Sequence, residues 1–157
     1  MGIQGGETVA CHMYRMALMA SLLTPPTLDK TRCIEMALVH DLAEAIVGDI
    51  TPDCGVSREE KRRREEQAMS CIIASLGETS PQARRVRELW NEYEEDKTEE
   101  ADFVHQLDKL ELALQASEYE QKYASKNMGV FKDSANPRIT DSRLRPIMDQ
   151  LFDSLPS

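Results

Sequence analysis

Aromatic residues make up only 5% of this 157-residue chain, and runs of β-branched residues are few. Both kinds of residue are enriched in β-strands, so their scarcity argues against a fold built on a sheet. Ala, Leu, Met, Glu, Lys and Arg dominate instead, and these residues favour helices. The length suits one domain with a substantial core but not two. We therefore predict a single all-α domain.

The chain also lacks long apolar runs, a surplus of positive charge and closely paired cysteines. No apolar run approaches a membrane span, and no N-terminal signal segment is visible. The formal net charge is −9, which argues against a general nucleic-acid binder because phosphate backbones attract Lys and Arg. The four cysteines form no C-x-x-C pair, which predicts reduced thiols rather than a disulfide framework. We expect a cytoplasmic protein that binds neither nucleic acid nor membrane.

Apolar residues recur at three- and four-residue steps along most of the chain, as in amphipathic helices. Ser57 and Ser80 fit helix N-caps, and Gly48 fits a helix terminator. Pro146 predicts that the last helix is kinked or starts late. About six helices are expected, over residues 8–23, about 29–47, 58–77, from 81 onward, about 98–125 and about 140–153, with an irregular stretch at 126–138.

A histidine and an aspartate stand side by side in the apolar stretch "ALVHDLAEAIVGDI", residues 37–50. Glu44 lies one helical turn after His40 and Asp41, so the three side chains share roughly one face. That face also carries apolar neighbours and therefore points inward. Imidazole nitrogen with carboxylate oxygen is a ligand set that suits Mn, Fe, Co, Ni or Zn. Further ligands would have to come from elsewhere in the chain.

Two other predicted helices carry a polar residue on their inner stripe. His12 interrupts the stripe of the first helix, and Asp108 interrupts that of the fifth, with His105 one turn earlier as a possible neighbour. An unpaired buried aspartate is costly, and a metal ion would remove that cost. Taken singly, an inward histidine is more often a hydrogen-bonded core residue than a ligand. For Asp108 alone, an ion pair with an arginine is as good an explanation as a metal. The combination on three separate helices favours a metal site.

This combination resembles the HD-domain phosphohydrolases, whose pattern is H…HD…D. The resemblance is closer to one branch, the HD-domain-containing 5′-deoxynucleotidases. It covers about residues 3–123 and implies an HD-domain helical bundle over residues 1–125. Residues 126–157 would then be a C-terminal extension whose last helix packs on the same domain. The segments that carry the resemblance are HMYRMALMA, ALVHDLAEAIVGDITP, EEKRRREE, LWNEYEE and QLDKLELALQASEYE, in that order.

The resemblance implies a metal-dependent phosphomonoesterase that cleaves deoxyribonucleoside 5′-monophosphates to nucleoside and phosphate. It also implies a homodimer. One divalent ion, with Co, Mn, Mg, Zn and Fe as the candidates, would be the cofactor. The resemblance makes its ligands His12, His40, Asp41 and Asp108.

Four further residues receive roles at the substrate. Glu44 matches the family's catalytic glutamate. Asp49 matches the acid that contacts the sugar, and we count it with both the catalytic and the substrate-binding residues. We further expect Lys61 or Arg64 to assist the phosphate.

Two features depart from the family pattern. Cys11 precedes the first histidine where the family has a carboxylate, which would alter metal affinity or ligand orientation. The family also has an earlier helix whose Arg and Trp hold the phosphate and sense the sugar, whereas this sequence opens with MGIQGGE and its only tryptophan is Trp90. We expect an HD domain without that helix and a weaker preference for deoxyribose. A hydrolase of another phosphorylated small molecule, or a catalytically impaired dimerisation or partner-binding protein, are the alternatives.

Overall fold

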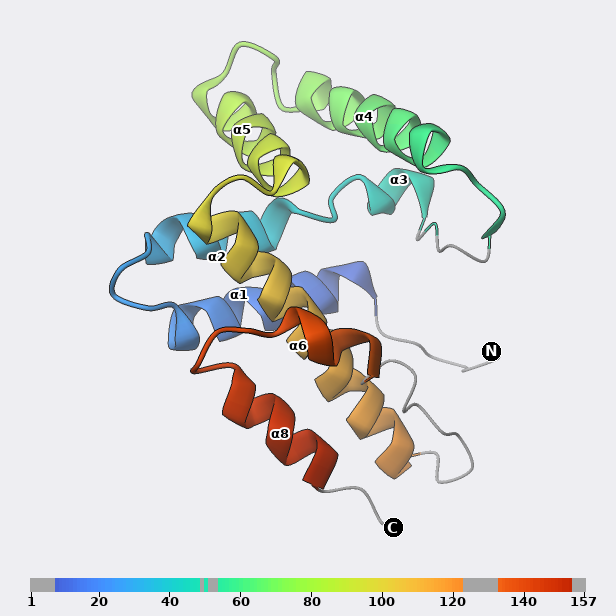
Figure 1. Cartoon of the computed structure of the whole chain (residues 1–157). Helices are drawn as coiled ribbons and strands as arrows, with labels where there is room; N and C mark the ends of the chain where they lie inside the picture. Colours follow the sequence, from blue (N-terminus) through green and yellow to red (C-terminus); the bar gives the residue numbers. More distant parts are fainter. Residues whose placement is uncertain (1–7, 49, 51–53, 123–132, 154–157) are drawn as a thin grey trace.

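The chain folds into packed helices, and the computed structural model describes residues 8–48, 50, 54–122 and 133–153 of it (Figure 1). The described residues form helices, turns and loops and contain no strand, so the all-α prediction is confirmed. Within them, no helix combines the length and the apolar character needed to cross a membrane. The elements are α1 (Val9–Leu23), α2 (Lys30–Val39), α3 (Glu44–Val47), α4 (Arg58–Ser75), α5 (Pro81–Glu95), α6 (Glu99–Lys122), the 3₁₀ helix η2 (Asn136–Arg138) and α8 (Arg145–Asp153).

Several helices begin where the sequence predicts a cap. The Ser57 hydroxyl accepts a hydrogen bond from the Glu60 backbone N–H at 3.2 Å, and the Ser80 hydroxyl accepts one from the Ala83 N–H at 3.1 Å. Each cap satisfies an amide that has no partner inside its helix. The last helix begins only at Arg145, which confirms the expected late start.

The predicted helix over residues 29–47 is wrong as one continuous element. α2 ends at Val39, and a turn over residues 40–43 leads into the short helix α3. The backbone N–H groups of Leu42, Glu44 and Ala45 donate to carbonyls three residues earlier, which is the 3₁₀ pattern. Side-chain periodicity does not distinguish this tighter turn from an α-helix. Gly48 ends α3 with φ of +74° and ψ of 168°, a conformation essentially restricted to glycine.

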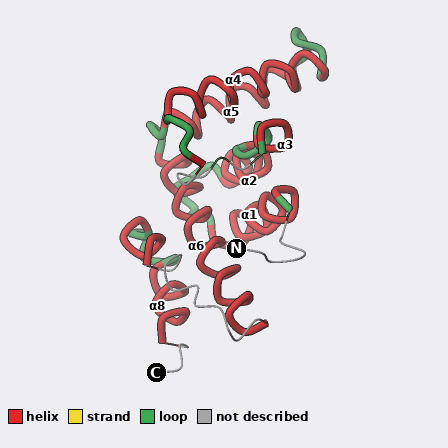
Figure 2. Tube along the Cα trace, turned by 90° about the vertical axis from the view of Figure 1, so that its right-hand side faces the viewer, coloured by secondary structure: helices red, strands yellow, loops and turns green. Residues whose placement is uncertain are grey.

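Helices α1, α2 and α6 lie against one another in the middle of the molecule. α4 and α5 lie beside each other at one end, where α5 contacts α2, and α8 lies along α6 (Figures 1 and 2). The largest side chains of the shared core come from α1, α2, α5, α6 and the C-terminal segment. They include Met16, Met36, Leu89, Leu107, Leu110, Leu144 and Met148, each at most 1% exposed.

The C-terminal segment and α4 pack in different ways. Leu144 and Met148 belong to the same core cluster as α6, so this segment does not pack by itself. The division of the chain near residue 125 nevertheless stays a prediction. α4 contributes Ala68 and Met69 to a smaller cluster that also contains Trp90 and Ala43. The turn after His40 is therefore anchored by α4 and α5 as well as by α2.

Shortening Leu107 to alanine should lower the free energy of unfolding by about 2–5 kcal/mol. The Leu107 side chain on α6 is fully buried, so its removal leaves a cavity in the core. Urea unfolding followed by circular dichroism measures this loss. Leu22→Ala is the matched control on α1, where the side chain is 72% exposed and the change should stay within about 0.5 kcal/mol. Equal losses in the two variants would contradict the position assigned to Leu107.

Candidate metal centre

Three segments that are distant in sequence bring the predicted ligands together. His12 comes from α1, His40 and Asp41 from the turn after α2, and Asp108 from α6. One donor atom from each of His12, His40 and Asp41 lies within 4.8 Å of the others. His12 Nε2 is 3.5 Å from Asp41 Oδ2 and 3.4 Å from Asp108 Oδ1, and His40 Nε2 is 3.1 Å from Asp41 Oδ2. His12, His40 and Asp41 therefore surround one small volume, and Asp108 adjoins it at His12 Nε2.

His40 and Asp41 stand where the hydrogen bonding of α2 changes to the 3₁₀ pattern. Adjacent side chains on a regular α-helix diverge by about 100°. His40 keeps α-helical φ and ψ and its N–H donates to the Met36 carbonyl four residues earlier, yet the imidazole nitrogen and the carboxylate oxygen of these neighbours approach to 3.1 Å. The break in the helix thus falls at the two residues that the HD motif names.

The donor spacing fits a shared cation. Ligands about 2.1 Å from one ion and separated by angles of about 90–110° lie roughly 3–3.5 Å apart, which matches the three distances above. His40 Nδ1 lies 3.0 Å from the Ala37 carbonyl oxygen, which can only accept, so Nδ1 carries the proton and Nε2 offers a lone pair. His40 Nε2 is buried and has no hydrogen-bond partner within the described part of the chain. A metal ion would satisfy this nitrogen.

The charges around the centre also favour a cation. Burial lowers the pKa of His12, but the neighbouring carboxylates of Asp108 and Glu111 reverse this effect and raise it to about 10. Burial raises the pKa of Asp108, yet His12 and Lys109 hold it well below its usual range. Lys109 Nζ lies 2.8 Å from Asp108 Oδ2. The carboxylates thus stabilise positive charge where His12 stands, as a divalent ion requires.

Of the other predicted catalytic residues, the structure describes Glu44 but not Asp49. Glu44 is half-buried and begins α3 directly after the turn that carries His40 and Asp41. Asp49 lies outside the described residues. Cys11 is exposed on α1 and is not among the clustered donors of the described chain.

The two basic residues proposed for the phosphate have different surroundings. Lys61 Nζ is 3.3 Å from Glu65 Oε1 and 3.3 Å from the Ile50 carbonyl oxygen. Arg64 lies on the exposed side of α4, where its Nε donates to Glu60 at 2.7 Å. Both residues are thus held by carboxylates of their own helix, and Lys61 also contacts the segment that follows α3.

Three side chains next to the centre either were not singled out by the sequence or received another role. Glu111 Oε2 lies 2.7 Å from His12 Nδ1, on the side of the ring away from Asp41 and Asp108. The Tyr93 ring packs 4.8 Å from the His40 ring and stacks at 3.9 Å on His105, whose Nε2 lies 3.0 Å from the Tyr93 carbonyl oxygen. His105 therefore contacts Tyr93 rather than the ligand cluster. In the sequence, the one hint at Glu111 is its position one turn after Asp108, on a helix that also carries many apolar residues.

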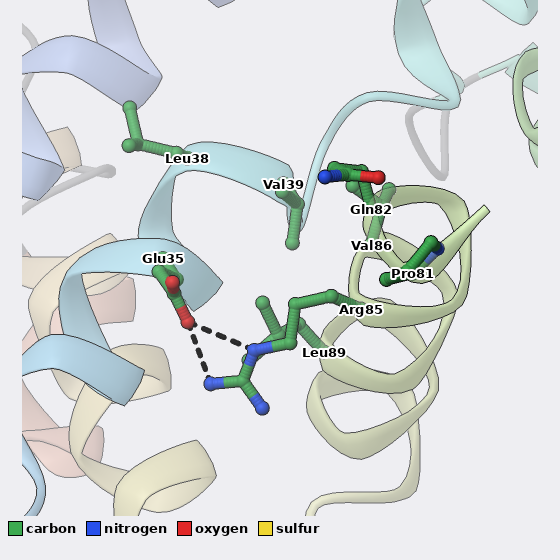
Figure 3. A pocket seen from close by; sticks show the side chains of 8 residues that line it. All are labelled: Glu35, Leu38, Val39, Pro81, Gln82, Arg85, Val86 and Leu89. Atoms are coloured by element: carbon green, nitrogen blue, oxygen red, sulfur yellow. Dashed lines mark hydrogen bonds and ion pairs between the residues drawn. The ribbon is translucent and has the colours of Figure 1, made fainter. Parts of the chain in front are cut away.

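An apolar pocket of about 370 Å³ lies between α2 and α5 (Figure 3). Arg85 from α5 forms an ion pair with Glu35 from α2 across it, at 2.6 Å. The residues that line this pocket include Leu38 and Leu89 but none of the four candidate ligands. We therefore do not place the chemistry there.

Fold and site together define an HD domain: residues 1–151 match the HD domain family, and the chain belongs to it. Among its relatives, the 5′-deoxynucleotidase HDDC2 of Mus musculus is 52% identical over 118 residues, which are 75% of this chain and 58% of the relative. HDDC2 of Homo sapiens is 43% identical over 150 residues, 95% of this chain and 72% of the relative. The chain thus spans about 58% of the mouse relative's length.

A solved structure gives the same fold. A predicted metal-dependent phosphohydrolase from Magnetospirillum magnetotacticum MS-1 aligns with a TM-score of 0.71 at 29% identity. The alignment covers 94% of this chain and 78% of that protein. The helices described above are therefore arranged as in that protein.

Proposed function

We propose that this chain is a metal-dependent phosphomonoesterase that hydrolyses deoxyribonucleoside 5′-monophosphates to deoxynucleoside and phosphate. The observation that carries the proposal is the convergence of His12, His40 and Asp41 at cation-ligand spacing, with Asp108 Oδ1 3.4 Å from His12 Nε2 and the buried His40 Nε2 making no hydrogen bond in the described chain. The names of the relatives support the reaction and the substrate class.

The four side chains would hold one divalent ion, for which Co, Mn, Mg, Zn and Fe remain the candidates. Two imidazoles and two carboxylates suit such ions. When bound, the ion supplies positive charge that stabilises the phosphate during displacement and lowers the pKa of water. The chain offers little positive charge of its own at this place, since Lys109 is already paired with Asp108.

Glu44 would move the proton in this reaction. We propose that its carboxylate accepts a proton from the attacking water as the new O–P bond forms. It would then return that proton to the 5′-oxygen as the old P–O bond breaks. Its position directly after the turn with His40 and Asp41 supports this role. A carboxylate near the ligands but not among them suits general acid–base work.

The remaining roles concern substrate binding. We propose that Asp49 accepts a hydrogen bond from a sugar hydroxyl and that Lys61 or Arg64 contacts the phosphate. Lys61 is supported by its contact with the Ile50 carbonyl oxygen, in the segment that follows α3.

We further propose a cytoplasmic homodimer. The four cysteines, Cys11, Cys33, Cys54 and Cys71, are free thiols, which agrees with a reducing compartment. The family resemblance supports the dimer. Sedimentation equilibrium of the purified chain tests the dimer, and a monomer at micromolar concentration would contradict it.

With Co²⁺ present, the purified chain should release phosphate from dAMP, and excess EDTA should abolish the release because the ion supplies charge that the chain lacks. Released phosphate is measured for dAMP, AMP and glucose 6-phosphate. Faster release from glucose 6-phosphate than from either nucleotide would favour another phosphorylated small molecule. Tight Co²⁺ binding without release from any substrate would overturn the proposal and favour a protein with impaired catalysis.

A further inference from the structure

Glu111 is a charged side chain in the core, only 1% exposed, and it lies behind the candidate metal centre. It stands on α6 one turn after Asp108, so the two carboxylates reach His12 from the same helix. Asp108 Oδ1 lies 3.4 Å from His12 Nε2, whereas Glu111 Oε2 lies 2.7 Å from His12 Nδ1. The two nitrogens of one ring are therefore held by two different acids.

Arg15 connects Glu111 to the surface. Its Nε lies 2.8 Å from Glu111 Oε1, and its two terminal nitrogens donate to Glu118 at 2.9 and 3.0 Å. Arg15 follows His12 by one turn of α1, and Glu118 follows Glu111 by two turns of α6. A row of charged groups thus runs from solvent to the metal centre in the order Glu118, Arg15, Glu111, His12.

A buried carboxylate is costly to maintain, and an ion pair only partly offsets its desolvation. If α1 and α6 needed only to be joined, the exposed bidentate pair between Arg15 and Glu118 would be enough. The additional buried acid is thus not needed to join the helices, and its other contact is with the imidazole of His12.

The two candidate histidine ligands also differ in what holds their Nδ1. His40 Nδ1 donates to the neutral carbonyl of Ala37 at 3.0 Å, whereas His12 Nδ1 faces a carboxylate at 2.7 Å. A carboxylate behind a metal-bound imidazole fixes the ring and makes its other nitrogen a stronger donor than a carbonyl does. The two rings are therefore not equivalent as ligands.

We propose that Glu111 is a positioning residue that accepts the Nδ1–H of His12 and so keeps Nε2 directed toward Asp41 and Asp108, the residues that would hold the metal with it. This inference rests on the proposed metal-dependent function and assigns a role to a residue outside the H…HD…D pattern. Arg15 Nε lies 2.8 Å from the second oxygen of Glu111, so its positive charge faces that carboxylate.

Replacing Glu111 by glutamine should weaken Co²⁺ binding about 10- to 100-fold, the usual cost of losing the acid behind a metal-bound histidine. Calorimetric titration of the intact chain with Co²⁺ measures the affinity directly, without any substrate. Glu92→Gln is the matched control, because Glu92 is also a largely buried acid, bound by Arg32 Nε at 2.7 Å between α5 and α2. The control should lose stability while keeping wild-type Co²⁺ affinity.

Wild-type affinity in folded Glu111→Gln protein would overturn the proposal and leave Glu111 with a purely structural role. A second measurement needs no variant. In wild-type protein loaded with Zn²⁺, nitrogen NMR of the histidine rings should show His12 protonated at Nδ1 and bound to the ion through Nε2. Coordination through Nδ1 would overturn the proposal.

These outcomes are separate from those that test the reaction. A chain that binds Co²⁺ in a Glu111-dependent way but releases no phosphate would retain the positioning role and lose the proposed activity. A chain that releases phosphate but binds Co²⁺ equally tightly with and without Glu111 would retain the proposed activity and lose the positioning role.

Discussion

Replacing Glu44 by glutamine should reduce phosphate release from dAMP by about 10²- to 10⁴-fold while leaving the metal content unchanged, because the substitution removes only the proton-accepting group. Glutamine has nearly the same size and should be tolerated at a half-buried position that begins α3. The rate is measured at saturating Co²⁺, and bound metal is measured by elemental analysis of the same preparation.

Glu59→Gln serves as the control for this result. Glu59 is also an acid in the first turn of a helix, but it is exposed on α4. Its substitution should change neither rate nor metal content. If Glu44→Gln loses metal together with activity, Glu44 is a ligand, and the division of roles between it and the four candidate ligands is wrong.

Replacing Asp108 by asparagine should remove most of the stabilisation that Co²⁺ gives to the fold. At a Co²⁺ concentration one hundred times the wild-type dissociation constant, binding stabilises the native state by about 2.7 kcal/mol, and a hundredfold weaker variant gains only about 0.4 kcal/mol. The physical reason is that Asp108 contributes a negatively charged oxygen 3.4 Å from His12 Nε2, and an amide oxygen is a weaker ligand. Thermal melts in EDTA and in Co²⁺ measure the difference for each protein.

Asp102→Asn on the same helix is the matched control. Asp102 is exposed and accepts a hydrogen bond from Gln106 at 2.7 Å, which asparagine can also accept. This variant should keep the full effect of Co²⁺. Equal stabilisation of wild type and Asp108→Asn would exclude Asp108 from the centre.

Most of the helices could be predicted from the sequence because their signals are local. Ser57 and Ser80 cap helices through bonds to backbone amides three residues away, and apolar residues repeat with the helical period. The break after Val39 could not be predicted in this way. It depends on whether the backbone bonds to the third or the fourth preceding carbonyl, and both patterns place side chains on nearly the same face.

The candidate centre was predictable in part for a similar reason. His12, His40, Asp41 and Asp108 each stand out as polar residues on an apolar helix face, and the structure brings all four together. Glu111 does not stand out, because an acid on a long helix with many charges is usually solvated. Only the packing of α6 against α1 shows that it is buried and faces His12.

The sequence by itself determined the helical class and most helix starts and singled out the candidate ligands, since these depend on residue type and on neighbours within one or two turns. The tertiary structure decided which nitrogen of each histidine faces the centre. It also decided that Lys109 pairs with Asp108, that His105 stacks on Tyr93, and that a buried carboxylate lies behind His12. Apart from the Lys109 pair, these contacts join residues 12 to 99 positions apart in the chain. They arise because the burial of apolar faces fixes how the helices lie against one another, and no local pattern specifies that arrangement.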